Sequence, residues 1–321
     1  MTGSMTKRSC TVGILYPGEM GSSLGKLLAA GGFRVVTTLE ERGPRTCRLC
    51  RDAGLEVLDS LIQVVRASEI AISLVTPASA VNLAEHFCDC AHLASRRPVF
   101  IDANSISPNT VRQIFRMVSR SRCRFVDASI HGLASRLRDQ GTIYLSGRSA
   151  QAIAELFAPV IRTNFLGESP GTASAMKMLM AGMSKGLVAL FLEMGVAARQ
   201  LGLLDELLAG CREYYPGVMT VLDRLVPTYP QHAARRGEEM NELEQTMLSM
   251  SLLPSMIHGA CRTITEVGKL QLADRKIDSD TAEWSVAEIV EAIHQLGGFR
   301  ATVEDTDDLD GESLEVGQAL A

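Results

Sequence analysis

The first half of the chain alternates short apolar runs with stretches of helical periodicity, and this pattern constrains the fold more than any other feature. The runs that suit buried strands are 11–16, 34–39, 70–75, 99–103, 124–130 and 142–147, and the main helical stretches among them are 21–31, 45–53, 79–94 and 108–119. Alternation at this spacing predicts a parallel sheet covered by helices on both faces. Ligands of such sheets bind at the carboxyl ends of the strands.

The second half has a different character, because helical periodicity dominates from Thr172 onward and no further strands are expected. The predicted helices are 172–201, 204–212, 216–226, 235–249, 253–271 and 281–296. The segment FLGESPG (165–171) is rich in Gly, Pro and Ser and is the expected linker. We therefore predict an α/β fold, with a Rossmann-type doubly wound parallel sheet over residues 8–168 and an all-α domain over 169–298.

The charge of the chain is unevenly distributed. Residues 304–315 carry seven of the acidic side chains and no basic one, so removing them from the net charge of −5 leaves +2. A body so close to neutral lacks the basic surface that binds nucleic acid, and the acidic tail over 299–321 is expected to be disordered. The most apolar stretch, 185–198, is interrupted by Glu193 and predicted to be too short to cross a membrane. A cytoplasmic protein is expected, since the N-terminus has no secretory pattern.

Eight cysteines are scattered along the chain, and two groups of them are closely spaced. Cys47 and Cys50 form a CxxC pair, and the segment HFCDCAH (86–92) holds two cysteines between two histidines. A zinc site needs four converging ligands, and the spacing alone does not bring these groups together. We expect free thiols and no metal.

The segment GILYPGEMGSSLG (13–25) follows a predicted strand and starts a predicted helix, which is the context that gives a glycine-rich turn its meaning. Gly18 would let a pyrophosphate approach the backbone, and Gly21 would permit close packing of helix on strand. Tyr16 replaces the first glycine of the usual fingerprint, and Pro17 supports the turn by another route. The turn predicts dinucleotide binding at the N-terminus of the helix, by Tyr16, Pro17, Gly18, Glu19 and Met20.

The same turn resembles the start of the β-hydroxyacid dehydrogenase superfamily, which includes 6-phosphogluconate and 3-hydroxyisobutyrate dehydrogenases. There the motif reads GxxGLGxMG, and Gly13, Gly18, Met20 and Gly21 match it. One branch of the superfamily carries a proline before the second glycine and has a distinct helical C-terminal domain of unknown function. The chain resembles this branch over about residues 10–270. The resemblance implies an oxidoreductase that uses a nicotinamide cofactor.

Further site residues are implied by the resemblance. LVTP (74–77) is similar to a loop that lies along the cofactor, and FIDANSISPNT (100–110) is similar to a segment near the nicotinamide ribose. The segment 125–147 resembles the loop that binds the substrate carboxylate, but His131 replaces its serine and Leu133 its second glycine. The residues assigned in this way are Val75, Thr76, Pro77, Asn104 and Ser105 for the cofactor, and Ser129, His131 and Gly132 for the substrate.

The segment PGTASAMKMLMAGMSKG (170–186) resembles the start of the family's interdomain helix and implies Lys177 as the catalytic lysine. The asparagines that hold substrate in the main family are replaced by Met180 and Ala181. Ser184 and Lys185 share a helical face with Lys177 and are candidates for the substrate site. RRGEEMNELEQTM (235–247) resembles a signature of the C-terminal domain, and we expect its acids, Glu239 and Glu242, on the surface.

The segment TTLEERGPRT (37–46) follows the second strand and bears on the choice of cofactor. Glu40 suits a ribose 2′-hydroxyl, whereas Arg42, Arg45 and Thr38 suit a 2′-phosphate. We therefore favour NADP, with NAD as the alternative.

The expected reaction moves a hydride between the nicotinamide and a small hydroxy or oxo compound held between the two domains. Two other functions stay open: an imine reductase on the same scaffold, suggested by the methionines at 176–183, and a non-catalytic redox sensor. A homodimer is expected through the helix 172–201, around Leu187, Leu190 and Phe191, because domains of the resembled family intertwine.

Overall fold

The computed structural model describes residues 10–275 and 284–300 and divides into two compact units. We call residues up to Leu179 the sheet unit and those from Met180 the helical unit. The predicted acidic tail lies outside the described residues from 301 onward. Each unit is described by itself.

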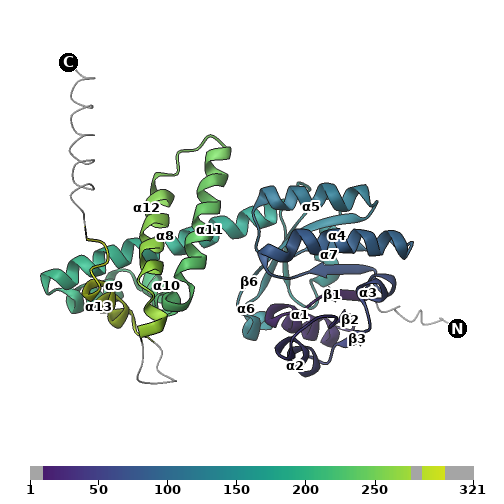
Figure 1. Cartoon of the computed structure of the whole chain (residues 1–321), viewed down its shortest axis with the longest axis horizontal. Helices are drawn as coiled ribbons and strands as arrows, with labels where there is room; N and C mark the ends of the chain where they lie inside the picture. Colours follow the sequence, from purple (N-terminus) through teal and green to yellow (C-terminus); the bar gives the residue numbers. More distant parts are fainter. Residues whose placement is uncertain (1–9, 276–283, 301–321) are drawn as a thin grey trace, which may run out of the picture. The chain divides into compact units, whose positions relative to one another are not determined.

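The sheet unit contains one eight-stranded sheet in the order β3-β2-β1-β4-β5-β6-β7-β8 (Figure 1). Its strands are β1 (Thr11–Leu15), β2 (Arg34–Thr38), β3 (Glu56–Leu58), β4 (Ile70–Ser73), β5 (Val99–Asp102), β6 (Arg124–His131), β7 (Thr142–Ser146) and β8 (Arg162–Phe165). All neighbouring pairs are parallel except β6 and β7. The predicted α/β fold with a doubly wound sheet is confirmed, although the sheet is mostly rather than entirely parallel.

Helices cover both faces of this sheet. They are α1 (Glu19–Ala30), α2 (Pro44–Asp52), α3 (Leu61–Ala67), α4 (Pro77–Leu93), α5 (Pro108–Arg120), α6 (Leu137–Gln140) and α7 (Ala150–Phe157), with a 3-10 turn η1 at Ala134–Arg136. Because successive strand residues point to opposite faces, Ile14 packs in the core under α1 and α7, and Leu15 in the core under α3, α4 and α5. Each such fully buried side chain stabilises the fold by roughly 1.5–3 kcal/mol.

Five strands and helices of the sheet unit escaped the sequence analysis. Strands β3 and β8 are short and largely exposed, so they lack the apolar run that identifies a buried strand. Helices α3, α6 and α7 are only 7, 4 and 8 residues long, too short for a clear helical period.

The helical unit contains no strand among its described residues. Its helices are α8 (Thr172–Leu201), which begins in the sheet unit, α9 (Leu204–Tyr214), α10 (Pro216–Leu225), α11 (Tyr229–Ser249), α12 (Ser255–Lys269) and α13 (Val286–Gln295), with 3-10 turns η2 (Val226–Thr228) and η3 (Leu272–Arg275). Helix α11 starts earlier than predicted because Pro230 is tolerated in the first turn of a helix. The start of α13 is set by a capping box between Ser285 and Glu288.

Helix α8 is longer and more apolar than the sequence analysis allowed. Its 30 residues include an 18-residue window of mean hydropathy 1.5, enough by length and composition to span a membrane. The expectation of too short an apolar stretch was wrong, because small and apolar residues extend it on both sides. In the structure Val188, Leu192 and Val196 are buried in the helical unit, so one face of α8 packs in the core of that unit, and 44% of the apolar window is buried.

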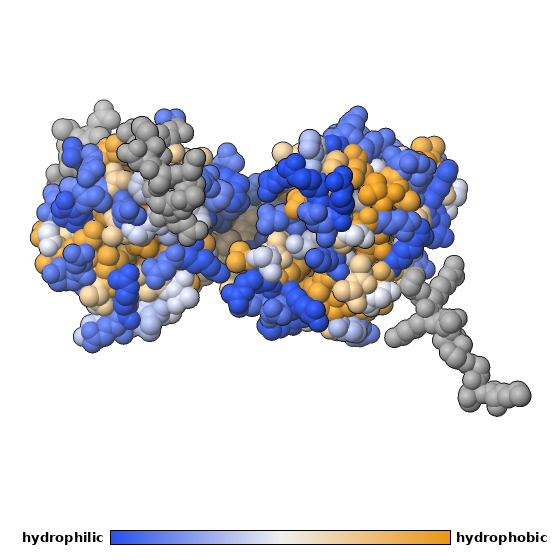
Figure 2. All heavy atoms as spheres, turned by 90° about the horizontal axis from the view of Figure 1, so that it is seen from below, coloured by the Kyte–Doolittle hydropathy of each residue, from blue (hydrophilic) through white to orange (hydrophobic). Residues whose placement is uncertain are grey.

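The outer surface of α8 is also rich in apolar side chains. Met183, Leu190, Met194 and Leu201 are exposed, whereas Phe191, expected at a dimer seam, is buried inside the helical unit. Apolar surface, orange in Figure 2, lies among polar side chains on both units.

The boundary between the units falls inside α8. The sequence predicted it at residues 168/169, in the loop before the helix, but the contacts divide the chain after Leu179. The reason is that the start of α8 is hydrogen-bonded to Asp127 in strand β6 of the sheet unit. The predicted linker 165–171 therefore leads into a helix that is anchored to the sheet.

Candidate cofactor and active site

The turn between β1 and α1 is well formed although it lacks the first fingerprint glycine. Tyr16 takes that position and adopts a φ of +51°, in the left-handed region that favours glycine. Pro17 is buried beneath the helix, and a Cβ at Gly21 would lie 2.9 Å from the Cβ of Pro17. Gly21 therefore permits the close approach of helix to turn that the sequence predicted for it.

Gly18 is the N-cap of α1, and the space beside it is open. No side chain of the described residues caps this helix end, and a Cβ on Gly18 would meet no atom within 4 Å. The first-turn N–H groups are therefore available to an anion, as at other helix N-termini. Glu19 opposes a phosphate here, but Arg45 lies 3.6 Å from its carboxylate and balances the charge. The turn fits a dinucleotide pyrophosphate.

The end of β2 presents an arginine beside this turn. The Arg42 guanidinium lies over the Tyr16 ring, 4.5 Å from its centroid, and Arg42 Nε donates to the Glu40 carbonyl oxygen at 3.2 Å. The Glu40 carboxylate instead accepts from the Leu61 N–H at the start of α3, at 3.4 Å. Thr38 is fully buried and its hydroxyl accepts from the Glu40 N–H, which argues against direct contact with a ligand.

Asn104 joins the loops that follow β4 and β5. It is buried, its Oδ1 accepts from the Val75 N–H at 2.7 Å, and its Nδ2 donates to Ser73 Oγ at 2.8 Å. Thr76 and Pro77 are exposed at the start of α4, and Ser105 is exposed after β5. Asn104 thus holds in place the loops whose outer residues the sequence assigned to the cofactor.

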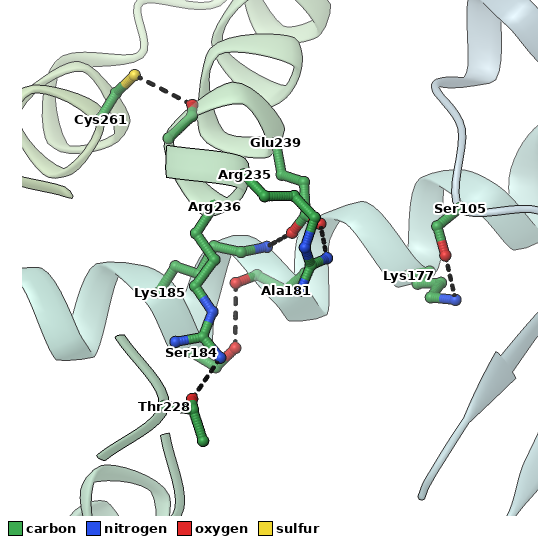
Figure 3. A network of polar contacts seen from close by, with 11 residues as sticks. Ser105, Lys177, Ala181, Ser184, Lys185, Thr228, Arg235, Arg236, Glu239 and Cys261 are labelled. Carbon is green, nitrogen blue, oxygen red and sulfur yellow. Dashed lines mark hydrogen bonds and ion pairs between the residues drawn. The ribbon is translucent and has the colours of Figure 1, made fainter. Parts of the chain in front are cut away.

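Lys177, Ser105 and His131 come together at the carboxyl end of the sheet. Lys177 Nζ donates to Ser105 Oγ at 2.8 Å (Figure 3). Burial lowers the pKa of His131, and the positive charge of Lys177 lowers it further. The imidazole is therefore neutral near pH 7, beside a lysine that can exchange a proton.

The surroundings of His131 fix its ring. Ser129 is buried below it, with 3.4 Å between Ser129 Oγ and His131 Nε2. The His131 ring packs edge-on against Tyr144, with 4.8 Å between centroids. Gly132 follows with a φ of +120°, which glycine readily adopts. Ser129 therefore orients His131, while His131 and Gly132 lie toward the surface.

Ser184 and Lys185 belong to the helical unit and are engaged there. Lys185 is buried and its Nζ lies 2.6 Å from Glu239 Oε2, and Arg235 pairs with the other carboxylate oxygen at 2.5 Å (Figure 3). Burial alone would raise the pKa of Glu239, but Lys185, Arg235 and Arg236 hold it below its usual value. The hydroxyl of Ser184 donates to the Ala181 carbonyl oxygen of its own helix.

Of the two acids expected on the surface, Glu242 is exposed, whereas Glu239 is only partly exposed and pairs with the buried Lys185. Glu239 turns toward Lys185 because a buried ammonium requires a counter-charge.

Comparison with known proteins gives the family. A model of the NAD binding domain of 6-phosphogluconate dehydrogenase matches residues 11–163, and a model of a domain of unknown function, DUF1932, matches residues 198–267. An uncharacterised 28.5 kDa protein of Methanothermus fervidus is 30% identical over 248 residues, which are 77% of this chain and 94% of that protein. A solved protein of unknown function, described as structurally similar to 3-hydroxyacid dehydrogenases, is 32% identical with a TM-score of 0.66, covering 81% of this chain and 97% of that one.

The chain belongs to the β-hydroxyacid dehydrogenase superfamily. Within it, the DUF1932 domain identifies the branch that the sequence analysis expected. The superfamily fold is shared with the 3-hydroxyisobutyrate dehydrogenase of Mycobacterium tuberculosis, solved with L-serine, at 16% identity and a TM-score of 0.68, over 89% of this chain and 99% of that one.

Two residues of this superfamily member escaped the sequence analysis. Asp127 lies in the segment 125–147, and the signal that could have identified it is its place in a buried strand, where a carboxylate must find hydrogen-bond donors. Tyr144 packs on His131, a contact that sequence spacing does not reveal because the two residues lie on different strands.

The cysteines of this superfamily member are dispersed. Cys50 and Cys88 are buried in the sheet unit, where burial raises the pKa of both thiols. In the described part of the chain, no three His, Cys, Asp or Glu side chains are grouped so that they could hold a metal ion.

Proposed function

We propose that the protein is an NADP-dependent oxidoreductase that interconverts a small hydroxy compound and its oxo form. The observation that carries the proposal is the hydrogen bond between Lys177 and Ser105, with a neutral His131 close by, on the sheet unit of a dehydrogenase family member. A proton-exchanging lysine at the carboxyl end of a nucleotide-binding sheet is what this reaction requires.

The residues of the sheet unit divide into cofactor and substrate groups. The N-terminus of α1 at Gly18 would hold the pyrophosphate, and Arg42 would hold the adenosine side. Val75, Thr76, Pro77 and Ser105 would line the path to the nicotinamide. The bound nicotinamide supplies or accepts the hydride.

Lys177 would hold and exchange the proton of the substrate oxygen. In the reductive direction its ammonium donates a proton to the oxo oxygen, and in the oxidative direction its amine accepts one from the hydroxyl. His131 is neutral and can donate or accept a hydrogen bond to the same compound. The ion pair with Glu239 gives Lys185 a structural role in the helical unit, and Ser184 is a weaker candidate because its hydroxyl is bonded to its own helix.

The preference for NADP rests on the arrangement of Arg42 and Glu40 in the loop that follows β2. Arg42 is held over Tyr16, and its terminal guanidinium nitrogens have no hydrogen-bond partner among the described residues. The Glu40 carboxylate, which would suit a ribose 2′-hydroxyl, is bonded to the start of α3. A planar guanidinium suits the doubly charged 2′-phosphate.

We further propose that the protein acts in the cytoplasm.

Cofactor binding can be tested at two positions. A Cβ on Gly18 would meet no atom within 4 Å, so we expect Gly18→Val to change the melting temperature little and to lower NADPH binding at least tenfold by filling the space beside the turn. Arg42→Ala should weaken NADPH binding about tenfold and NADH binding much less, because only NADPH carries the 2′-phosphate. Fluorescence titration with both nucleotides measures each effect. Equal losses for the two nucleotides would remove Arg42 from the 2′-phosphate site.

The catalytic role of Lys177 can be tested with Lys177→Met, which keeps the side-chain length and removes the charge. Loss of a positioned acid–base group should lower kcat by roughly 100-fold or more, with NADPH affinity unchanged. Steady-state kinetics on a panel of hydroxy and oxo compounds gives kcat, and fluorescence titration gives the NADPH affinity. Thr172→Ala is the control on the same helix, because the Thr172 hydroxyl donates to the Ser169 carbonyl oxygen and belongs to neither candidate group. Near-normal turnover of Lys177→Met would assign the proton to another group, with His131 first.

An imine reductase on this scaffold is the second candidate. Met180 and Ala181 occupy the positions where the main family is expected to have polar asparagines, and a less polar site suits a C=N substrate better. Assay of cyclic imines beside the oxo panel distinguishes the two reactions. A protein that binds NADPH but turns over neither panel, and in which Lys177→Met changes nothing, would be a redox sensor instead.

A further inference from the structure

The Asp127 carboxylate accepts five hydrogen bonds in the sheet unit. It lies in strand β6, fully buried, opposite Asp102 on β5 and Ser146 on β7. Its Oδ2 accepts from the backbone N–H groups of Gly171 at 2.9 Å, Ala173 at 2.9 Å and Ser174 at 3.1 Å.

Two hydroxyl groups complete the shell of this carboxylate. Ser146 Oγ donates to Oδ2 at 2.9 Å, and Ser174 Oγ donates to Oδ1 at 2.6 Å. Ser146 Oγ also accepts from the Ala173 N–H at 3.1 Å. We call the set Asp127, Ser146, Gly171, Ala173 and Ser174 the α8 clamp.

The α8 clamp fixes the start of α8 in both position and rotation. A carboxylate at the first N–H groups of a helix satisfies donors that have no partner within the helix and interacts favourably with the helix dipole. Gly171 has a φ of +99°, which glycine readily adopts and which directs its N–H toward Asp127. Because several N–H groups donate to one oxygen, a rotation of the helix about its axis would break several hydrogen bonds at once.

Lys177 lies one helical turn beyond this clamp. Residues three and four apart share a helical face, so Lys177 follows Ala173 and Ser174 on the same side. Side chains of a helix lean toward its N-terminus, and the Lys177 ammonium reaches Ser105 at 2.8 Å. The rotation that Asp127 sets is thus also the rotation that directs Lys177 to Ser105.

We propose that Asp127 is a positioning residue, which holds the start of α8 so that Lys177 is aligned for proton exchange with the substrate. The inference rests on the proposed function for its catalytic consequence. Asp127 acts through the backbone of α8 and touches neither cofactor nor substrate.

Three variants distinguish loss of the α8 clamp from general destabilisation of the fold. Asp127→Asn keeps the shape and one acceptor oxygen but removes the charge. Ser174→Ala removes one hydroxyl of the clamp and favours the helix. Thr172→Ala is the matched control, because its hydroxyl lies in the same turn but donates to the Ser169 carbonyl oxygen, outside the clamp.

The first measurement does not depend on activity. Competitive acetylation of the full-length protein with acetic anhydride, followed by mass spectrometry, gives the reactivity of Lys177 relative to the exposed Lys26. We expect Asp127→Asn to change this ratio at least threefold and to accelerate hydrogen exchange at residues 173–177, and Thr172→Ala to change neither. An unchanged Lys177 ratio in both clamp variants would overturn the proposal.

The second measurement uses turnover. A small misplacement of a catalytic group lowers the rate of the chemical step strongly. We therefore expect kcat to fall about tenfold in Ser174→Ala and on the order of 100-fold in Asp127→Asn. The pH profile of kcat should shift, and the KM for NADPH should stay unchanged. A raised KM with normal kcat would contradict the proposal. If the wild type turns over no compound but the Lys177 ratio responds, the proposed function fails while the positioning of Lys177 by Asp127 stands.

Discussion

Tyr16 illustrates how far single residues can be predicted. The sequence located the phosphate turn and identified the missing glycine, but it did not predict that Tyr16 would adopt the glycine conformation itself. That conformation costs a non-glycine residue about 1–2 kcal/mol. The Arg42 guanidinium over the ring can offset part of this cost. Such compensation comes from a residue in the loop between β2 and α2, and periodicity and spacing carry no information about it.

Asp102 gives a prediction about pH. It is fully buried beside Asp127, and its Oδ2 has no hydrogen-bond partner in the described part of the chain. Burial raises its pKa from 3.8 to about 7, a rise that the Asn104 N–H opposes and the charge of Asp127 reinforces. The folded state thus holds this proton more tightly than the unfolded state, so its contribution to stability falls as pH rises from about 4 to 7 and is constant above that range.

The asparagine of Asp102→Asn cannot ionise, so the variant should not lose stability in this way as the pH rises. We expect the free energy of unfolding of the variant, relative to wild type, to rise by about 2–3 kcal/mol between pH 5 and pH 8. Urea denaturation at the two pH values measures the difference, and any constant cost of the amide cancels. Parallel pH dependence of the two proteins would mean that Asp102 is ionised throughout this range.

At the scale of elements, apolar patterning predicted the longer strands and the helices of the second half well. Exposed edge strands such as β3 and β8 lack that pattern, and the antiparallel pairing of β6 with β7 follows from tertiary contacts rather than from composition. The candidate site was predicted in part. The resemblance supplied Lys177, Ser105 and His131, whereas the α8 clamp depends on three segments that meet only in the folded sheet unit.

Two glycines in helices of the helical unit give opposite predictions. A Cβ on Gly186 in α8 would meet no atom within 4 Å, whereas a Cβ on Gly268 in α12 would lie 3.2 Å from the backbone nitrogen of Ala234 in α11. Gly186→Ala should raise the free energy of unfolding by about 0.5–1 kcal/mol. Gly268→Ala should lower it by about 1–3 kcal/mol, because helix backbones cannot easily move apart. Thermal and urea unfolding of both variants test the pair, and the same sign for both would contradict this packing.

At the scale of the whole molecule, the outer face of α8 leads us to expect a homodimer. Met180, Met183, Leu187, Leu190, Met194 and Leu201 follow one another at intervals of three, four or seven residues, and all but the partly buried Leu187 are exposed. This spacing is that of a helix seam that packs against another helix. Contiguous apolar surface of this kind marks an interaction site on a soluble protein.

The dimer can be tested by sedimentation at micromolar concentration, where we expect twice the chain mass of 34.7 kDa. Leu190→Glu places a charge in the centre of the seam and should shift the protein to monomer. Leu93→Glu, at another exposed leucine, at the end of α4 in the sheet unit, is the control and should leave the mass unchanged. A monomer in the wild type would exclude the seam.

The placement of Tyr16 and Tyr144 gives the protein a spectroscopic property. They are the two tyrosines of the sheet unit, and both lie in the candidate site, while the chain's single tryptophan, Trp284, lies in the helical unit. Near-ultraviolet circular dichroism of the tyrosines should therefore respond to occupancy of the site. Excitation of Trp284, with the emission of a bound reduced nicotinamide as the acceptor signal, reports on the same occupancy from the helical unit. One unlabelled sample thus contains two optical probes of ligand binding, one in each unit.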